Sequence, residues 1–499
     1  MKASKLYRLL TVLVALTLFS CEDFLDLNPL DKMSNETFWT SEKEVQMALT
    51  GCYRRLRDEP FFAASRVLLD ALTDNAQYKW SGNPNLLEIS RGMIETTTGG
   101  VISSIWGSAY KGISTCNNFM ENVDKAPLGE EDLRRYKGEV RFLRAFFYFE
   151  LVHYFGDVIL YRENPKTISE SKLAQSPRAE VLGFIHTDLD SAIAALPDDR
   201  YDKGHAVRGS AMALKARVLI FEERFEEAAQ ITEEIILSGR FRLDANYREL
   251  FLYRPERSRE IMFSTRYMNP DDYSDLDVML ILWAGSMPRQ ELADAYECTD
   301  GLSIAESPLY DSVNPYAQRD PRLGMSLMVP GEIWLNPNGT QHHPDPSQTG
   351  LFQKKYVDSL RLPISTSTRS DQDYIHIRYA DVLLMHAEAR NEVSGPVQSV
   401  YDAVNAVRDR VDMPDLPAGL SQSEMRERIR HERRIELALE GLRYYDLKRW
   451  KIAHTVMPQV HDVGDVPIVF ENPKHYLWPY QQSELEVNPN LVPNPDYIF

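Results

Sequence analysis

The clearest pattern of apolar and polar positions runs from residue 374 to residue 450. Its first stretch, IHIRYADVLLMHAEARNEV, places apolar side chains on one helical face at Tyr379, Val382, Leu383, Met385 and His386. Recurrence at i, i+3, i+4 and i+7 is typical of an amphipathic helix, so we expect the whole stretch to be helical. The Gly-Pro pair at 395–396 should end this helix, because proline lacks the backbone donor that a helix needs.

Two further helices are predicted in the same block. The stretch VQSVYDAVNAVRDRV has one apolar face, formed by Val400, Ala403, Val404 and Val407. In the run SEMRERIRHERRIELALEGLRYYDLKRW, Ser423 is placed for an N-cap and Gly441 for a hinge or C-cap. Its charges lie one helical turn apart in the pairs Glu424/Arg428, Arg428/Glu432 and Glu440/Arg443, which favours ion pairs along the helix.

A second helix pair is predicted between Ser210 and Ser238. The short joint at Glu223-Arg224 should make its two helices antiparallel. Ala216 and Ala228 have the separation of the two small positions of a tetratricopeptide repeat. Because such pairs stack so that each buries its neighbour, we predict a mainly all-α fold of tetratricopeptide-like helix pairs in a superhelix.

Two segments interrupt this helical pattern. Residues 241–373 are rich in Pro, Gly, Asn and Asp, and long loops of this kind are usually functional or contain short elements. The stretch LLDALTDNAQYKWSGNPN, residues 68–85, reads as an irregular loop that gathers polar and aromatic side chains before a proline.

Several long motifs strongly resemble the SusD/RagB family of cell-surface nutrient-binding lipoproteins. They are RYADVLLMHAEA, ERRIELALEGLRYYDLKRW, GEVRFLRAFFYFELVHYFGDV and the tail YLWPYQQSELEVNPNLVPNPDYIF. The resemblance implies a signal peptide at 1–20 and one SusD-like domain at 21–499. Within that domain it implies a helical scaffold at about 35–240 and 374–455, a loop-rich region at 241–373 that carries the ligand site, and an extended tail at 456–499.

The N-terminus indicates where the protein is located. Basic residues precede an apolar run, Leu9 to Phe19, that is too short to span a bilayer and reads as part of a signal peptide. The following Leu18-Phe19-Ser20-Cys21 resembles a lipobox, so we predict lipidation at Cys21. Acidic residues follow directly, and in lipoproteins of this kind they are associated with export to the outer face of the outer membrane. We therefore predict a membrane attachment through lipid alone.

Charge and cysteine content exclude some classes of partner. The net charge of −18 argues against a nucleic-acid partner, because phosphate binding needs concentrated basic surface. Cys52, Cys116 and Cys298 have no zinc-site spacing; we expect small buried apolar side chains, with a single disulfide as the alternative.

Catalytic and metal motifs are weak. Glu436 and Glu440 lie one turn apart, but nearby arginines favour an ion-pair network over the acid chemistry of a glycosidase. No GxSxG, HExxH or GxxxxGK motif occurs. The adjacent His342 and His343 read as surface loop. The cluster DDYSDLD lacks the glycine and distal glutamate of an EF-hand and reads as an acidic turn rather than a calcium site. We predict that the protein is not an enzyme and that it binds no cofactor and no metal.

Aromatic residues in polar loops are the remaining candidates for a binding site. Sugars offer apolar CH faces and hydroxyl rims, so their sites combine flat rings with Asp, Asn and Arg. Trp39, Trp106, Trp450 and Trp478 fall in patterned segments and read as structural. The candidate ligand-binding residues are Asp74, Tyr78, Trp80, Asn83, Trp283, Arg289 and Trp334. In SusD-like proteins the loop that corresponds to Trp80 often contributes to the ligand site.

The resemblance and the residues together favour a non-catalytic surface lipoprotein. It would deliver an oligosaccharide to a SusC-like TonB-dependent transporter, with its helices holding the transporter and its loops the nutrient. The alternative is a RagB-like uptake component or helical scaffold that binds peptide or protein. A hydrolase is the third reading.

Overall fold

The computed structural model describes residues 38–57, 60–252, 258–336, 338–339, 341 and 347–497. The predicted signal peptide, Cys21 and the pair His342-His343 lie outside these residues. Among the helices that are described, none is both long and apolar enough to cross a bilayer.

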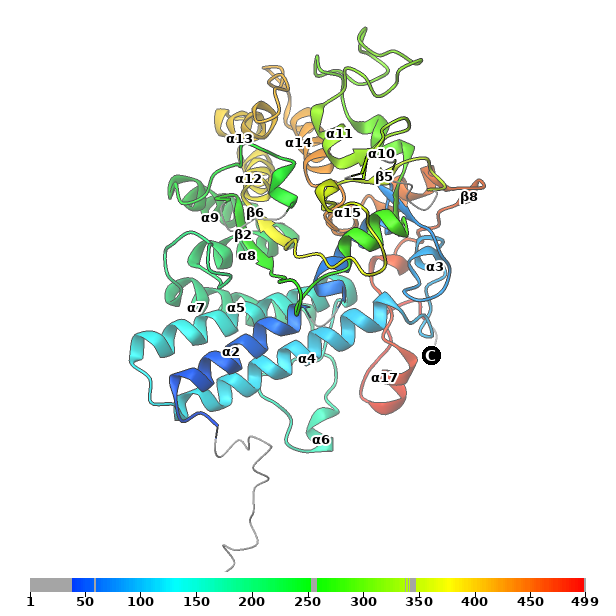
Figure 1. The fold of residues 1–499 in the computed structure, drawn as a ribbon. Helices are drawn as coiled ribbons and strands as arrows, with labels where there is room; N and C mark the ends of the chain where they lie inside the picture. Colours follow the sequence, from blue (N-terminus) through cyan, green and yellow to red (C-terminus); the bar gives the residue numbers. More distant parts are fainter. Residues whose placement is uncertain are drawn as a thin grey trace, which may run out of the picture.

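A row of long helices forms the scaffold, as the sequence predicts. They are α2 (Glu42–Arg57), α4 (Val101–Asn122), α5 (Glu130–Phe155), α7 (Arg178–Ala195), α8 (Arg208–Phe221), α9 (Phe225–Leu237), α12 (Tyr379–Ser394), α13 (Gln398–Asp409) and α14 (Gln422–Glu436). Each helix packs against the next, and α12 contacts both α13 and α14 (Figure 1). The mainly all-α prediction is confirmed.

Residues 238–378 are inserted between two helices that touch. Helix α9 packs directly on α12, although the insertion separates them in the sequence. The strands β2 (Ile261–Thr265) and β6 (Tyr374–Arg378) pair antiparallel, and β6 runs straight into α12. The helix predicted to include residues 375–378 therefore begins only at Tyr379. All five residues of β6 are buried, so both faces of this strand are covered by the core. Its backbone groups find their hydrogen-bond partners in β2.

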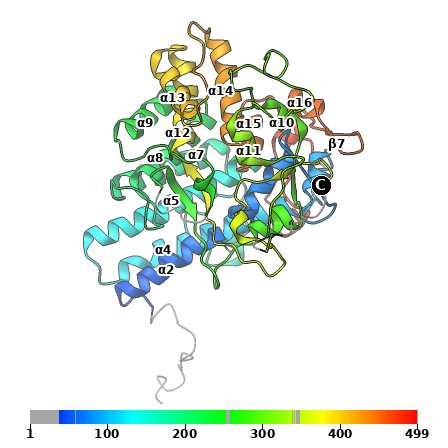
Figure 2. The ribbon, with the colours of Figure 1, turned by 45° about the horizontal axis from the view of Figure 1, so that its top comes forward.

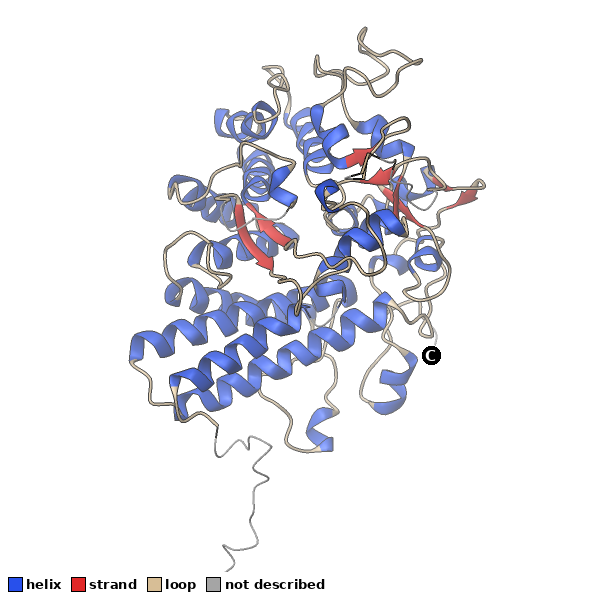
Figure 3. Ribbon diagram, viewed as in Figure 1, coloured by secondary structure: helices blue, strands red, loops and turns tan. Residues whose placement is uncertain are grey.

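The insertion contains short elements within long connections. They include a π-helical turn (Val278–Leu282), β3 (Ser286–Pro288), α10 (Gln290–Ala295), α11 (Pro321–Ser326), β4 (Leu327–Met328) and β5 (Phe352–Gln353). Figure 3 shows these short strands among loops. Two views place α10 and α11 beside α14 rather than beside α8 and α9 (Figures 1 and 2). A small apolar cluster that joins Leu292 and Leu323 to Ile435 holds them there.

The stretch predicted as an irregular loop, residues 68–85, is more ordered than expected. It contains most of a 3₁₀ helix (Ala64–Leu72), the strand β1 (Ala76–Tyr78) and a turn before α3 (Leu86–Ser90). Strand β1 pairs with β3 of the insertion. Three-residue strands carry too little alternation to be read from one sequence, and their partner lies far away in the chain.

The core is centred on the aromatic face of α5. Phe142, Phe146 and Phe147 are buried there, and α4 approaches closely because Gly112 has no side chain. A Cβ atom at Gly112 would lie 2.5 Å from the Phe147 ring. Cys52, Cys116 and Cys298 are free and buried, as expected for small apolar residues. Helix α2 is capped by Glu44, which accepts hydrogen bonds from the backbone of Thr40 and Ser41.

The run predicted as one helix from residue 423 has a different start and a break. Ser421, not Ser423, is the N-cap of α14, in a capping box with Glu424. Helix α14 ends at Glu436, and α15 (Arg443–Arg449) follows after a turn. Gly441 has φ +77°, and a Cβ atom there would lie 2.3 Å from the carbonyl oxygen of Arg66. Gly441 is therefore the hinge that the sequence indicated.

Three charges of this run that were expected to pair along the helix pair across the fold instead. Arg428 contacts Glu297, Glu432 contacts Arg408, and Glu440 contacts Arg378, at 2.9, 3.0 and 2.7 Å. The expected pairs Glu424/Arg428, Arg428/Glu432 and Glu440/Arg443 are therefore wrong. The partners come from other elements instead: Glu297 from the insertion, Arg408 from α13 and Arg378 from β6.

Glu436 shows the strength of this network. Burial alone would raise the pKa of Glu436, but the guanidinium groups of Arg410, Arg378 and Arg322 hold it well below its usual range. The ion-pair reading of this region is thus confirmed, with arginines from distant elements in place of neighbours on the same helix.

The C-terminal segment returns across the end of α5. It contains α16 (Ala453–Val456), β7 (His461–Asp462), β8 (Val466–Pro467) and α17 (Gln482–Val487). Trp478 is fully buried and stacks on Tyr154 of α5, with ring centroids 4.2 Å apart. Trp39, Trp106 and Trp478 are buried, as predicted for structural tryptophans, whereas Trp450 is partly exposed and donates a hydrogen bond of 2.8 Å to Glu388.

Candidate ligand-binding surface

Strands β1 and β3 form a short antiparallel ribbon that brings two distant loops together. Tyr78 pairs with Ser286, and Ala76 pairs with Pro288. Trp80 follows β1, and Trp283 precedes β3. In an antiparallel pair the end of one strand lies beside the start of the other, so both tryptophans lie at the same end of this ribbon.

Both indoles are accessible. Trp80 is 39 % exposed and Trp283 is 43 % exposed, whereas Trp39, Trp106 and Trp478 are buried. The ring of Tyr78 meets Trp80 edge to face, with centroids 5.8 Å apart. The ammonium of Lys79 lies 5.3 Å from the centroid of Trp80. Two partly exposed indoles at the same end of the ribbon, with polar residues around them, offer apolar faces suited to the CH face of a sugar.

Asn83 lies in the same exposed turn as Trp80. The turn is fixed by a hydrogen bond of 2.7 Å from the backbone N–H of Gly82 to the carboxylate of Glu88. Asn83 is exposed and offers one acceptor and two donors to a hydroxyl rim. Of the predicted residues, Tyr78, Trp80, Asn83 and Trp283 are therefore brought together at this end of the ribbon.

Asp74 and Arg289 are buried and point inward. Asp74 accepts hydrogen bonds from Arg443, and Arg434 lies 3.0 Å away. Burial would raise the pKa of Asp74, but these two arginines hold it well below its usual range. Arg289 pairs with Asp462 and donates to the carbonyl of Ala76. Their polar groups have protein partners, so Asp74 and Arg289 position the ribbon and do not line its exposed end, contrary to their prediction as ligand-binding residues.

Trp334 does not join this surface. Its indole is 7 % exposed, belongs to the main apolar core and donates a hydrogen bond of 2.9 Å to Glu332. Polar neighbours in the sequence suggested a surface loop, but the ring itself packs inward. It is a packing residue in the described structure.

A neighbouring hollow was missed by the sequence analysis. It has a volume of about 290 Å³ and is lined by Ser65, Tyr267, Tyr273, Asp275 and Met279, among others. Met279 belongs to the π-helical turn that directly precedes Trp283, and its carbonyl accepts from the backbone N–H of Gly285. Tyr273 is 38 % exposed. In the sequence, the position of Tyr273 among the acidic residues of DDYSDLD was the signal that could have indicated this hollow.

The acids of DDYSDLD point in different directions. Asp272 pairs with Arg57 at 2.9 Å, while Asp277 is buried and accepts hydrogen bonds from Ser370 and Gln372. Burial raises the pKa of Asp277. Within the described ranges, no group of three or more His, Cys, Asp or Glu side chains is arranged to hold a metal ion.

Comparison with known proteins connects this geometry to a family. Residues 252–497 match the model of the SusD family, and residues 23–220 match a model described as "Starch-binding associating with outer membrane". SusD-like protein P2 of Formosa agariphila is 28 % identical over 98 % of this chain and 99 % of its own length.

Two solved structures extend the likeness to the fold. A SusD-like carbohydrate binding protein from Bacteroides fragilis is 29 % identical, with a TM-score of 0.81 over 91 % of this chain and 100 % of its own. A laminarin binding SusD-like protein is 25 % identical, with a TM-score of 0.75 over 92 % of this chain and 100 % of its own. The family models cover both the scaffold and the insertion, and the chain belongs to the SusD/RagB family.

Proposed function

We propose that this protein is a non-catalytic nutrient-binding lipoprotein that captures an oligosaccharide at the Trp80–Trp283 end of the β1–β3 ribbon. The observation that carries the proposal is the pair of half-exposed indoles, at 39 % and 43 %, contributed by two loops far apart in the sequence. Aromatic faces bind the CH face of a sugar ring mainly by apolar burial, and polar groups such as Asn83 supply direction.

Similarity to glycan-binding proteins supports the ligand class. One solved relative is described as carbohydrate binding and another as laminarin binding. Asp74 is held by two arginines and Glu436 lies in the buried network, so neither of these two carboxylates is available for the acid chemistry of a glycosidase. Capture without hydrolysis is the function that fits these groups.

Cell-surface attachment and delivery complete the proposal. Cys21 would carry the lipid that holds the protein at the outer face of the outer membrane. A SusC-like TonB-dependent transporter would receive the oligosaccharide, with the stacked helices α2 to α9 as its docking region. Similarity to a model described as associating with the outer membrane supports this location.

A glycan array tests the ligand class directly. The chain without residues 1–21 would be applied to an array that includes laminarin oligosaccharides and to a matched peptide library. We expect saturable glycan binding that is reduced in Trp80→Ala and Trp283→Ala. Binding to peptides with no glycan bound would overturn the proposal in favour of a RagB-like peptide carrier.

A further inference from the structure

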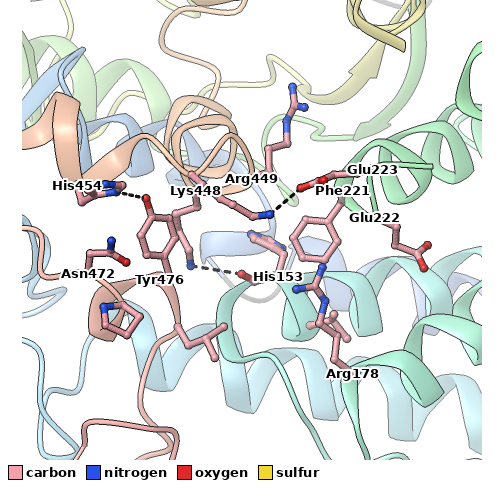
Figure 4. A pocket seen from close by; sticks show the side chains of 14 residues that line it. His153, Arg178, Phe221, Glu222, Glu223, Lys448, Arg449, His454, Asn472 and Tyr476 are labelled. Carbon is pink, nitrogen blue, oxygen red and sulfur yellow. Dashed lines mark hydrogen bonds and ion pairs between the residues drawn. The ribbon is translucent and has the colours of Figure 1, made fainter. Parts of the chain in front are cut away.

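A second cavity lies where the ends of α5 and α8 meet α15 and residues 472–477 (Figure 4). Its volume of about 650 Å³ is within the usual range of small-molecule pockets. It shares no lining residue with the Trp80–Trp283 surface or with the hollow beside Tyr273. Apolar side chains of Phe221, Tyr476 and Leu477 contribute to its walls.

Lys448 brings a buried amine to this cavity, and this amine is positively charged when it is protonated. The residue is 7 % exposed, and its ammonium donates one hydrogen bond of 3.3 Å to the carbonyl of His153. The rings of Tyr154, Tyr444 and Trp478 surround the ammonium, with centroids 5.3, 5.2 and 5.8 Å away. In the part of the chain that the structure describes, no carboxylate forms an ion pair with it. An ammonium has three N–H donors, so Lys448 can donate further hydrogen bonds to an anionic ligand in the cavity.

Arg178 is a second cation at the same cavity. Its guanidinium lies 4.2 Å from the centroid of the Phe221 ring. Figure 4 shows Arg178 and Phe221 on one side of the cavity and Tyr476 on the other. Over the described residues its guanidinium has no ion pair with a carboxylate. The other charged groups that line the cavity have partners: Glu223 pairs with Lys451, Glu222 with His186, and Arg449 with Glu388.

His153 provides a buried acceptor. Its Nδ1 lies 3.2 Å from the carbonyl oxygen of Phe149, so Nδ1 carries the proton in the neutral ring. The opposite nitrogen, Nε2, is buried and has no hydrogen-bond partner among the described groups. Burial, together with the charges of Lys448 and Arg66, lowers the pKa of His153 well below its usual value and keeps the ring neutral. Its Nε2 can therefore accept a hydrogen bond from a hydroxyl group.

From these groups we infer that the cavity binds a sugar acid, a ring that carries both a carboxylate and hydroxyls. The carboxylate would pair with Lys448 and Arg178, and a hydroxyl would donate to Nε2 of His153. The face of Tyr476 and the side chain of Leu477 would cover the ring. A neutral sugar would leave the ammonium without a counter-charge, and a simple inorganic anion would leave the apolar walls and His153 unused.

Calorimetric titration of the purified chain with glucuronate and galacturonate tests this inference, with glucose and galactose as neutral counterparts. We expect saturable heat with at least one acid and none with its neutral counterpart at the same concentration. Lys448→Met and Arg178→Gln should each weaken binding by roughly ten- to 100-fold, since each removes a charge-assisted contact. Lys137→Gln is the matched control: it removes a cation that is paired with Asp124 near the opposite end of α5 and should leave the affinity unchanged.

Three outcomes would overturn the inference. They are no saturable heat with either acid, equal affinity for an acid and its neutral counterpart, and equal affinity for inorganic phosphate. Arg178 is exposed, so Arg178→Gln is expected to fold even if Lys448→Met does not. Wild-type affinity in folded Arg178→Gln would contradict the role of that residue in binding the carboxylate.

Discussion

Asp74 and Arg443 form a bidentate ion pair in which Nε and Nη2 of the arginine each donate to a different carboxylate oxygen at 2.9 Å. The pair joins the segment that leads into β1, in the N-terminal part of the chain, to the start of α15 in the C-terminal part. It therefore fixes the candidate ligand-binding surface to the helical scaffold.

Removing one partner of this pair should destabilise the protein strongly. Asp74→Ala leaves the charges of Arg443 and Arg434 buried without a counter-charge, and we expect a loss of about 3–5 kcal/mol in the free energy of unfolding. Denaturant titration measures the change. Asp409→Ala, which removes an exposed carboxylate on α13, is the control and should change stability by less than about 0.5 kcal/mol. A similar, small effect in both variants would contradict the structural role of Asp74.

Low pH should destabilise the protein through its buried carboxylates. The native pKa values of Asp74, Asp381 and Glu436 are held below their ordinary values by arginines that outweigh the effect of burial. Stabilisation by such groups is complete above their unfolded pKa values of about 4 and is lost as pH falls toward the native values. The melting temperature should therefore fall steeply below about pH 4, and less steeply in Asp74→Ala.

Lys448 should give a pH dependence of the same sign at higher pH. Burial lowers its pKa to about 7, and the nearby charge of Arg178 acts in the same direction. The unfolded lysine keeps a pKa of about 10.4, so between pH 7 and 10 the unfolded state binds more protons and stability rises with pH. Lys448→Met lacks this effect. The stability of the wild type relative to Lys448→Met should thus increase from pH 7 to pH 10; a constant difference would mean that Lys448 titrates normally.

An element could be predicted from the sequence where the residues that determine it are neighbours in the chain. The helix pair α8–α9 has two strong apolar stripes and a short joint, so its fold follows from neighbours in the chain. Strand β6 pairs with β2, and Arg428 pairs with Glu297, each more than a hundred residues away in the chain. Glu440 is buried against Arg378, which is also distant in the sequence. No local pattern reveals these partners. The same limit applies to the site: Trp80 and Trp283 were identified by their polar neighbours, whereas the inward direction of Asp74, Arg289 and Trp334 is set by the tertiary fold.

Membrane attachment should depend on a single residue. Cys21→Ala is expected to abolish lipid labelling and to release the protein from the membrane fraction when its partner transporter is absent, because no other anchor is predicted. Metabolic labelling with a fatty-acid analogue and fractionation measure the two effects. A variant that stayed in the membrane fraction would contradict the lipoprotein prediction.

The affinity of Trp80→Ala for a glycan identified on the array, measured together with its melting temperature, tests the central claim most directly. Trp334→Ala is the control, because that indole is buried and should show its loss as reduced stability, by about 3–5 kcal/mol. We expect Trp80→Ala to weaken glycan binding by about 1–2 kcal/mol, roughly 5- to 30-fold, with little change in melting temperature. Unchanged affinity together with a large fall in melting temperature would place Trp80 in the core and contradict the proposed site.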